Sequence, residues 1–176
     1  ELSGQPKNGF TLETPNMWTI PTYDKDLNLV YLPTGNGPPD YWGGDRNAAK
    51  EKFGSAVVAV DATTGKNKWS YQIVHHDVWD YDLPSQPVLY NVTNDKGEQI
   101  PALIQTTKMG QIFVLDRRTG RPVTKVIEKP VPTTGQAEGE KLSPTQPYSV
   151  GMPQIGNDTL REKDMWGIST FDQLNC

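Results

Sequence analysis

One stretch of the sequence decides the fold: Val57-Val58-Ala59-Val60-Asp61-Ala62-Thr63-Thr64-Gly65-Lys66-Asn67-Lys68-Trp69. Residues 56–60 form a continuous apolar run that is typical of a strand buried on both faces. Residues 61–66 are typical of a tight turn, because an Asp side chain can bond the backbone that follows it and a Gly can adopt positive φ. Residues 68–74 alternate and predict a return strand. The stretch therefore predicts an antiparallel strand-turn-strand unit.

The same pattern occurs a second time along the chain. Ala59 to Lys66 and Val114 to Arg121 both contain an apolar residue, Asp, two variable positions, Thr, Gly and a basic residue. The two aspartates are 116 − 61 = 55 residues apart, which exceeds a typical propeller blade and leaves room for an inserted loop. Any two hairpins can share this turn by chance, but Trp69 completes a longer repeat in the first copy. The repeat predicts a β-propeller.

Composition supports an all-β protein. The 176 residues are 35% hydrophobic and include 16 Gly and 15 Pro, which favours short strands and many loops. No helical periodicity is evident. Residues 40–53, with Trp42 as their anchor, and residues 130–153 are expected to be loops, the second long enough to be functional. Further strands are expected at residues 28–32, 87–92, 102–106 and 111–115.

The charge balance argues against nucleic-acid binding, and the single cysteine does not indicate a redox compartment. Lys plus Arg number 17 and Asp plus Glu 21, a net charge of −4, and no basic stripe offers to bind nucleic acid. No apolar run is long enough to cross a membrane, and the single Cys176 cannot form an internal disulfide. Residues 165–176 read as the start of another unit. The sequence is therefore expected to be part of a longer protein. Its 176 residues are expected to supply about three to four blades of the propeller.

The residues with the most chemistry follow the first repeat directly. His75-His76-Asp77-Val78-Trp79-Asp80-Tyr81-Asp82 combines two histidines, three acids and two aromatic residues. In a propeller such a loop is a natural active-site position, which favours an enzyme. Adjacent histidines on a strand point to opposite faces, so metal binding by this pair is not expected.

At this point the sequence resembles a known family. The first repeat has the form A-x-D-x-x-T-G-x-x-x-W, which is that of the pyrroloquinoline quinone (PQQ) dehydrogenases. The second copy lacks the closing Trp, since Pro122 to Thr124 stand there. The motifs T-G-N-G-P-P (residues 34–39) and H-D-x-W-D (residues 76–80) are similar to those of membrane-bound quinoprotein glucose dehydrogenases. The resemblance implies that residues 1–176 are part of an eight-bladed, all-β propeller.

The resemblance also implies two positions that hold non-protein groups. Trp18 matches the tryptophan that forms the floor of the PQQ pocket, where a flat quinone can stack on the indole. Asn36 matches the asparagine whose side-chain oxygen binds a divalent cation, Mg²⁺ or Ca²⁺, both of which prefer oxygen ligands. Without the resemblance, Asn36 is interpreted as a turn residue and Trp18 as a core or blade-docking residue.

The resemblance also implies which residue is catalytic. Asp80 matches the aspartate that takes the substrate hydroxyl proton and also contacts the cation. Asp77 and Asp82 are rivals, and only the register of the motif selects Asp80. Lys108 stands where alcohol dehydrogenases of the family have Arg, and it would place a positive charge against the quinone oxygens.

The resulting expectation is a PQQ enzyme that oxidises D-glucose or other aldoses at C1 to the lactone. The resemblance implies ubiquinone as electron acceptor and a bacterial inner-membrane location, with the propeller in the periplasm and membrane segments outside this sequence. Because ligands from other blades are missing, this chain alone is expected to have little or no activity. The alternatives are a PQQ-dependent alcohol dehydrogenase and a cofactor-free propeller scaffold, which would have no need for Trp18, Asn36, Asp80 and Lys108 together.

Overall fold

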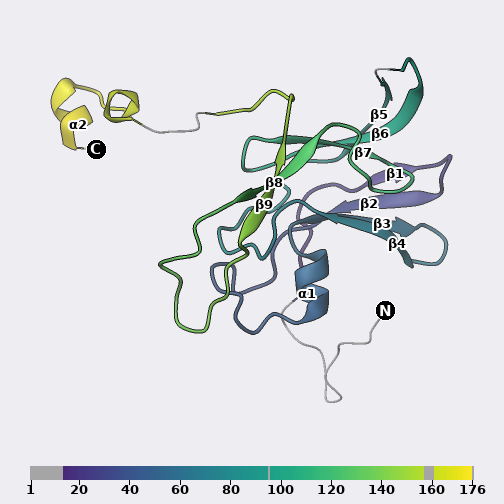
Figure 1. The fold of residues 1–176 in the computed structure, drawn as a ribbon, viewed down its shortest axis with the longest axis horizontal. Coiled ribbons are helices and arrows are strands. Elements are labelled where there is room, and N and C mark those ends of the chain that lie inside the picture. The colour runs from purple at the N-terminus through teal and green to yellow at the C-terminus, as the bar shows by residue number, and fades with distance from the viewer. Residues whose placement is uncertain (1–13, 95, 157–160, 176) are drawn as a thin grey trace.

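The computed structural model describes residues 14–94, 96–156 and 161–175, and the described strands form three antiparallel sheets (Figure 1). The first sheet has the order β1-β2-β3-β4 and the second β5-β6-β7, while β8 and β9 form a hairpin. The bounds are β1 Thr22–Asp24, β2 Leu29–Pro33, β3 Ala56–Asp61, β4 Asn67–Gln72, β5 Val88–Thr93, β6 Gln99–Thr106, β7 Ile112–Asp116, β8 Val126–Pro130 and β9 Thr145–Ser149. The six strands expected from the sequence are confirmed, and the all-β class with them.

The two large sheets share one apolar core. Strand β3 lies between β2 and β4, and its first four residues are buried, as its continuous apolar sequence predicts. The core contains side chains from both sheets, among them Tyr31, Val57, Trp69, Leu103, Phe113 and Leu115. Strands on neighbouring sheets therefore bury their apolar faces against each other, as blades of a propeller do.

The repeated turn has the same geometry in both copies. Asp61 Oδ1 accepts hydrogen bonds from the backbone N–H groups of Thr63 and Thr64, and Gly65 has a φ of 68°. In the second copy Asp116 Oδ1 accepts from the Arg118 N–H, and Gly120 has a φ of 72°. Positive φ is where glycine costs least, which explains the Thr-Gly step in the repeat.

Trp69 connects the two sheets through that second turn. Its indole N–H donates to the Arg117 carbonyl at 3.2 Å, and the Tyr31 hydroxyl donates to the same carbonyl at 2.8 Å. A Cβ added to Gly120 would lie 2.5 Å from Trp69 Cε3, so only glycine leaves room for the ring. The closing tryptophan of the first repeat is therefore the residue that docks on the second.

Some expectations for the loops were wrong. Residues 48–53, expected to be loop, form the short helix α1 (Ala48–Phe53), which begins at Asn47, whose side chain accepts from the Ala49 and Lys50 N–H groups. A second short helix, α2 (Thr170–Asn175), follows a 3-10 turn at Glu162–Asp164 and lies apart from the sheets (Figure 1). Both helices have six residues, too few to give a helical period in the sequence.

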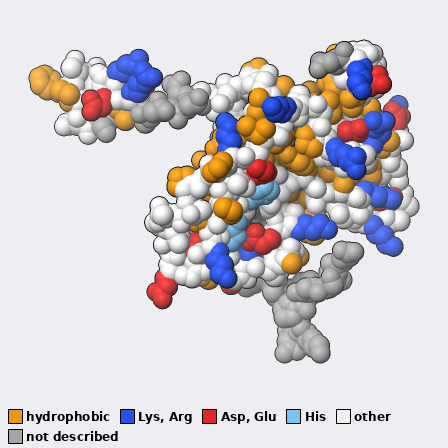
Figure 2. All heavy atoms as spheres, viewed as in Figure 1, with side chains coloured by type: hydrophobic (Ala, Val, Ile, Leu, Met, Phe, Trp, Pro, Cys, Tyr) orange, Lys and Arg blue, Asp and Glu red, His pale blue; other side chains and the backbone are white. Residues whose placement is uncertain are grey.

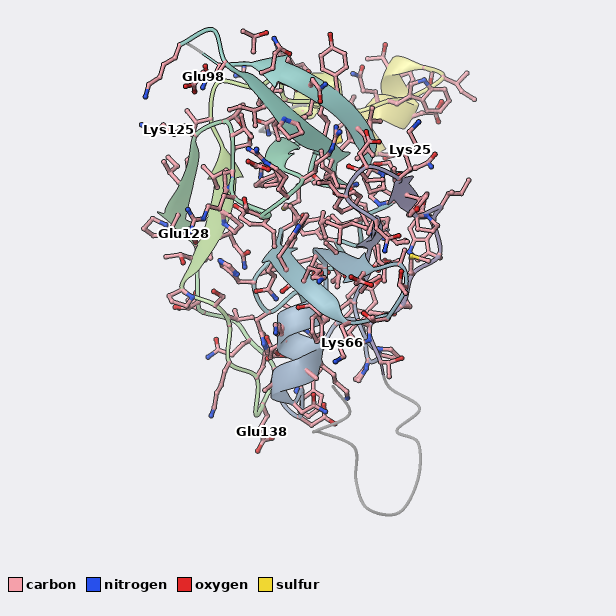
Figure 3. The ribbon with its side chains drawn as sticks, turned by 90° about the vertical axis from the view of Figure 1, so that its right-hand side faces the viewer. Lys25, Lys66, Glu98, Lys125, Glu128 and Glu138 are labelled. Carbon is pink, nitrogen blue, oxygen red and sulfur yellow. The ribbon has the colours of Figure 1, made fainter. Side chains whose placement is uncertain are left out.

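The long loop expected at residues 130–153 is interrupted by a strand. Strand β9 pairs with β8 over five residues, and residues 131–144 connect them. This connection extends toward α1, and Figure 3 labels Glu138 at its tip. The Trp42 indole N–H donates to the Glu138 carbonyl at 3.3 Å. Trp42 is thus the anchor that the sequence suggested. Cys176 lies outside the described residues.

Candidate functional site

The site is built on the connection between β4 and β5, which carries residues 73–87. Its start is fixed by Ser55, whose carbonyl accepts from the N–H groups of Ile73 and Val74. Two other loops meet it. Residues 34–37, after β2, contribute Asn36, and residues 107–111, between β6 and β7, contribute Lys108. All three loops follow or join strands at the same end of the two sheets, so the fold brings together residues far apart in the sequence.

The three acids of the cluster have different environments, and Asp77 is the most enclosed. Its Oδ1 accepts from the Trp79 N–H at 2.9 Å, and its Oδ2 accepts from the Tyr81 N–H at 2.8 Å and from the Ser55 hydroxyl. Burial raises the pKa of Asp77, and these three hydrogen bonds offset part of that rise. With both oxygens occupied and the side chain buried, Asp77 has no free face for a substrate.

Asp82 is also buried and also saturated. Its Oδ1 accepts from the Asn36 N–H at 2.6 Å, and its Oδ2 accepts from the Trp18 indole N–H at 2.9 Å. Burial opposes ionisation, but the hydrogen bonds from Asn36 and Trp18 and the nearby Lys108 ammonium hold the pKa of Asp82 below its ordinary value. A Cβ on Gly35 would lie 2.4 Å from Asp82 Oδ1, so the glycine before Asn36 lets the carboxylate approach the backbone.

Asp80 differs from both neighbours because its carboxylate is accessible. The side chain is 36% exposed, and the Lys108 ammonium lies 3.3 Å from its Oδ2. Lys108 Nζ also donates to the Asp80 carbonyl at 2.8 Å and lies 3.4 Å from Asp82 Oδ2. Burial works against the charge of Lys108, but Asp82 and Asp80 outweigh it and raise the pKa of Lys108. The geometry therefore makes Asp80 the acid of the three that can exchange a proton with a bound molecule.

Trp18 presents an open aromatic face beside this ion pair. It is 57% exposed even though its indole N–H is bonded to Asp82. Lys108 Nζ lies 5.6 Å from the centre of its ring. A flat surface that is held by a hydrogen bond and flanked by a cation suits a flat ligand that carries electronegative oxygens. Trp18, Asp80 and Lys108 are thus brought together.

Asn36 lies deeper and is joined to the cluster only indirectly. It is 2% exposed, and its Nδ2 donates to the carbonyls of Asp40 and Asp77 at 2.9 and 2.7 Å. These bonds fix Oδ1, which accepts from the Gly37 N–H at 3.0 Å and keeps a second lone pair. The structure records no direct contact between the side chains of Asn36 and Asp80.

A divalent cation would need more ligands than these two residues supply. Among residues 14–94, 96–156 and 161–175, no group of three or more His, Cys, Asp or Glu side chains is placed to hold a metal ion. Ca²⁺ takes about 6–8 oxygen ligands. The oxygen chemistry of Asn36 and Asp80 suits a hard cation, but a complete site needs further oxygens from a cofactor or from other residues.

The two histidines have supporting contacts. His75 exchanges two backbone hydrogen bonds with the Gln146 side chain and contacts Glu128 on β8. His76 lies between Glu51 of α1 and Glu140 of the 131–144 connection. Both histidines, the only ones in the chain, lie next to acidic side chains in Figure 2. They attach the loop to α1 and to the β8–β9 hairpin.

A cavity of about 850 Å³ lies beside the cluster and is separate from it. Trp79, Tyr81 and Met109 line it, together with residues of the 131–144 connection. Along the loop these aromatic residues alternate with Asp80 and Asp82, which contact Lys108 instead. The cavity therefore holds none of the four residues singled out from the sequence.

Sequence reasoning missed the residues that hold this cluster in place. Ser55, Glu51 and Glu140 contact Asp77 or His76 from positions 22 to 64 residues away in the sequence. None belongs to the recognised motifs. A serine after glycine and two glutamates in polar segments carry no distinctive pattern, so no signal in a single sequence could have found them.

Known proteins are similar to this chain over almost its whole length. Residues 2–176 match the PQQ family of glucose/ethanol/alcohol dehydrogenase β-propeller domains. The chain is 50% identical over 172 residues to a quinate/shikimate dehydrogenase (quinone) of Acinetobacter baylyi. The aligned region covers 98% of this chain and 21% of that relative. It is 49% identical over 167 residues to the quinoprotein glucose dehydrogenase of Escherichia coli, covering 95% of the chain and 21% of the relative.

Solved structures agree as well. The quinohemoprotein alcohol dehydrogenase of Comamonas testosteroni superimposes with a TM-score of 0.58 at 29% identity, over 79% of this chain and 20% of that one. The chain spans about a fifth of the length of each of these proteins. From the near-complete match to the family, the repeat and the sheet architecture, it follows that this chain belongs to the PQQ-dependent dehydrogenases with a β-propeller fold.

Proposed function

We propose that the whole protein that carries this chain oxidises D-glucose or another aldose at C1 to the lactone, with PQQ as the cofactor. The observation that carries this proposal is the cluster at the loop ends. It combines an open indole face at Trp18, an accessible carboxylate at Asp80 and an ammonium at Lys108 that contacts both. A scaffold propeller would have no need for this combination.

In this proposal each residue has one role. Trp18 stacks against the flat face of PQQ, and Lys108 places its charge against the quinone oxygens. Asp80, whose carboxylate is exposed, takes the proton of the C1 hydroxyl. When bound, PQQ supplies the two-electron acceptor, and a cation held by Asn36 and Asp80 supplies positive charge beside it.

The choice of substrate is the finer part of the proposal. The motifs of the sequence favour an aldose, and a glucose dehydrogenase is among the relatives at 49% identity. A relative named for quinate and shikimate is equally similar at 50% identity, and a solved neighbour is an alcohol dehydrogenase. Oxidation of a cyclic or primary alcohol by the same cluster is therefore the second candidate.

The cellular setting also belongs to the proposal. We propose that electrons pass to ubiquinone and that the propeller faces the periplasm at the bacterial inner membrane. No helix in the described part of the chain is long and apolar enough to cross a membrane. Membrane attachment would then depend on residues beyond this sequence.

The first experiment measures PQQ-dependent dye reduction by the whole protein with D-glucose, quinate and ethanol, in the presence of Ca²⁺ or Mg²⁺. Activity with D-glucose that requires PQQ supports the aldose assignment, and activity only with quinate or ethanol moves it to the alcohol branch. Absence of PQQ-dependent activity with all three rejects the proposal. Quenching of tryptophan fluorescence by PQQ, compared between wild type and Trp18→Leu, tests cofactor binding separately. We expect this chain alone to show little or no turnover.

A further inference from the structure

Asp80 has a backbone conformation that needs support. Its φ is 62°, in the left-handed region that residues other than glycine rarely adopt. Such residues cost about 1–3 kcal/mol and persist only where surrounding contacts fix them. Within the described residues the Asp80 side chain caps no neighbouring backbone N–H; it contacts Lys108 and the Asp82 carboxyl. Lys108 also holds the Asp80 carbonyl. The peptide groups on either side of Asp80 have a separate support.

One buried carboxylate supplies that support on both sides. Asp77 Oδ1 accepts from the N–H of Trp79, the residue before Asp80, and Asp77 Oδ2 accepts from the N–H of Tyr81, the residue after it. The Ser55 hydroxyl donates to Oδ2 and connects the carboxylate to the start of β3. The two peptide groups that flank Asp80 are therefore held by two different oxygens of the same side chain.

Asp77 also contacts the candidate cation ligand. Its backbone carbonyl accepts from Asn36 Nδ2 at 2.7 Å, which helps to orient the Asn36 amide. A single residue thus contacts both the segment that carries the candidate base and the side chain that is the candidate cation ligand. The Asp77 carboxylate itself is buried, so it is not exposed to a bound molecule.

We propose that Asp77 is a positioning residue for this reaction: its carboxylate fixes the peptide groups on both sides of Asp80 and so aims the Asp80 carboxylate at the substrate. The inference rests on the proposed function, since it assigns Asp77 a part in the step that Asp80 performs. Asp77 itself touches neither substrate nor cofactor. Its effect on the reaction is through the position of Asp80.

The substitution Asp77→Asn tests this inference, because an amide has one oxygen where the carboxylate has two. Whichever way the amide is turned, its NH₂ group faces the N–H of either Trp79 or Tyr81, and that N–H loses its acceptor. In the whole protein we expect kcat to fall about 10- to 100-fold, as for a small misplacement of a reacting group, with KM little changed. In cofactor-free protein we expect faster amide hydrogen exchange in the segment 78–82.

The matched control is Asp61→Asn, at the exposed hairpin turn. There both N–H groups donate to the same oxygen, Oδ1, so an asparagine can keep both bonds. We expect the control to leave kcat and exchange in residues 78–82 unchanged. Wild-type kcat in Asp77→Asn, or unchanged exchange in that segment, would overturn the inference, whereas a wild-type protein without PQQ-dependent turnover would instead reject the proposed function.

Ser55→Ala keeps the inference testable if Asp77→Asn does not fold. It removes one donor to Asp77 and leaves both backbone bonds in place, so we expect a smaller fall in kcat, up to about 10-fold, and a smaller increase in exchange. If Ser55→Ala behaves as wild type in both measurements while Asp77→Asn is unfolded, Asp77 serves folding alone and the positioning role is rejected.

Discussion

Two aspartates of this chain do the same local job in different surroundings. Asp61 caps the hairpin turn between β3 and β4, and Asp77 caps the loop that leads to β5. Each accepts two backbone N–H groups that follow it within four residues. The turn after Asp61 is exposed, whereas Asp77 is buried against Ser55. The comparison teaches that burial changes what such a cap does. Where water is excluded, the backbone N–H groups depend on the aspartate for a hydrogen-bond acceptor, so the aspartate fixes the position of the loop.

The largest expected effect separates the chemistry of the loop from its structure. Asp80→Asn removes the candidate base but keeps the size of the side chain. The hydrogen bond from Lys108 to the backbone carbonyl of residue 80 is retained. We expect kcat of the whole protein to fall about 100- to 10,000-fold, because a positioned base contributes on that scale. Urea unfolding should be nearly unchanged. Substantial remaining activity would assign the proton transfer to another group.

The next prediction compares the two copies of the repeated turn. Gly120→Ala places an alanine at a position with positive φ and brings its Cβ against the ring of Trp69. We therefore expect the free energy of unfolding to fall by about 2–4 kcal/mol. Gly65→Ala has the same backbone strain, but nothing lies within 4 Å of the added Cβ. It should cost only about 1–2 kcal/mol.

Urea unfolding of both glycine variants measures the difference. Equal losses would mean that backbone strain dominates and that the contact between Trp69 and Gly120 adds little to the attachment of the two sheets. A larger loss for Gly120→Ala would establish that contact as the interlock between them.

A smaller effect is expected from the contacts of Glu140, which attach the 73–87 connection to neighbouring segments. Glu140 is buried and accepts from the Gly43 N–H and from His76, which also contacts Glu51. Burial opposes its ionisation, but the bonds from Gly43, His76 and the Lys141 N–H lower the pKa of Glu140 below its ordinary value of 4.5. The ionised carboxylate therefore stabilises the fold above that value, and the stabilisation is lost as the pH falls through the lower folded pKa.

Glu140→Gln tests this pH dependence. At about pH 7 we expect it to lower the free energy of unfolding by about 1–3 kcal/mol, because a buried charged acceptor is lost. The difference from wild type should shrink as the pH falls below 4.5 and through the lower folded pKa, because the wild-type carboxylate is then protonated. Urea midpoints across this pH range measure it. A difference that is independent of pH would show that the ionised state of Glu140 does not contribute.

Much of this architecture could be predicted from the sequence, and the reason is local. The strand-turn-strand units depend on residues within a few positions of one another, as in the turn at Asp61, so six strands were found. Helix α1 and strands β1, β8 and β9 were not predicted. Helix α1 is too short to show a period, and β9 contains Pro147, which is tolerated there because both strands of a hairpin are edges.

The site was only partly predictable because it depends on contacts between distant segments. The motif selected Asp80 by register, and the structure supplies a physical reason, since Asp77 and Asp82 are buried and saturated. Nothing in the sequence indicates that Ser55 contacts Asp77 across 22 residues. The roles of Trp18, Asn36, Asp80 and Lys108 toward PQQ and the cation stay predictions.

The smallest expected effect returns to Asp61. In Asp61→Asn the remaining oxygen can accept from the N–H groups of both Thr63 and Thr64, whereas the ion pair with Lys68, 3.3 Å from Oδ2, is lost. An exposed ion pair contributes little, so we expect kcat within about two-fold of wild type and a urea midpoint close to it. If Asp61→Asn lowered kcat as much as Asp77→Asn, the position of Asp80 would depend on the first sheet as a whole. The buried carboxylate would then have no special part in it.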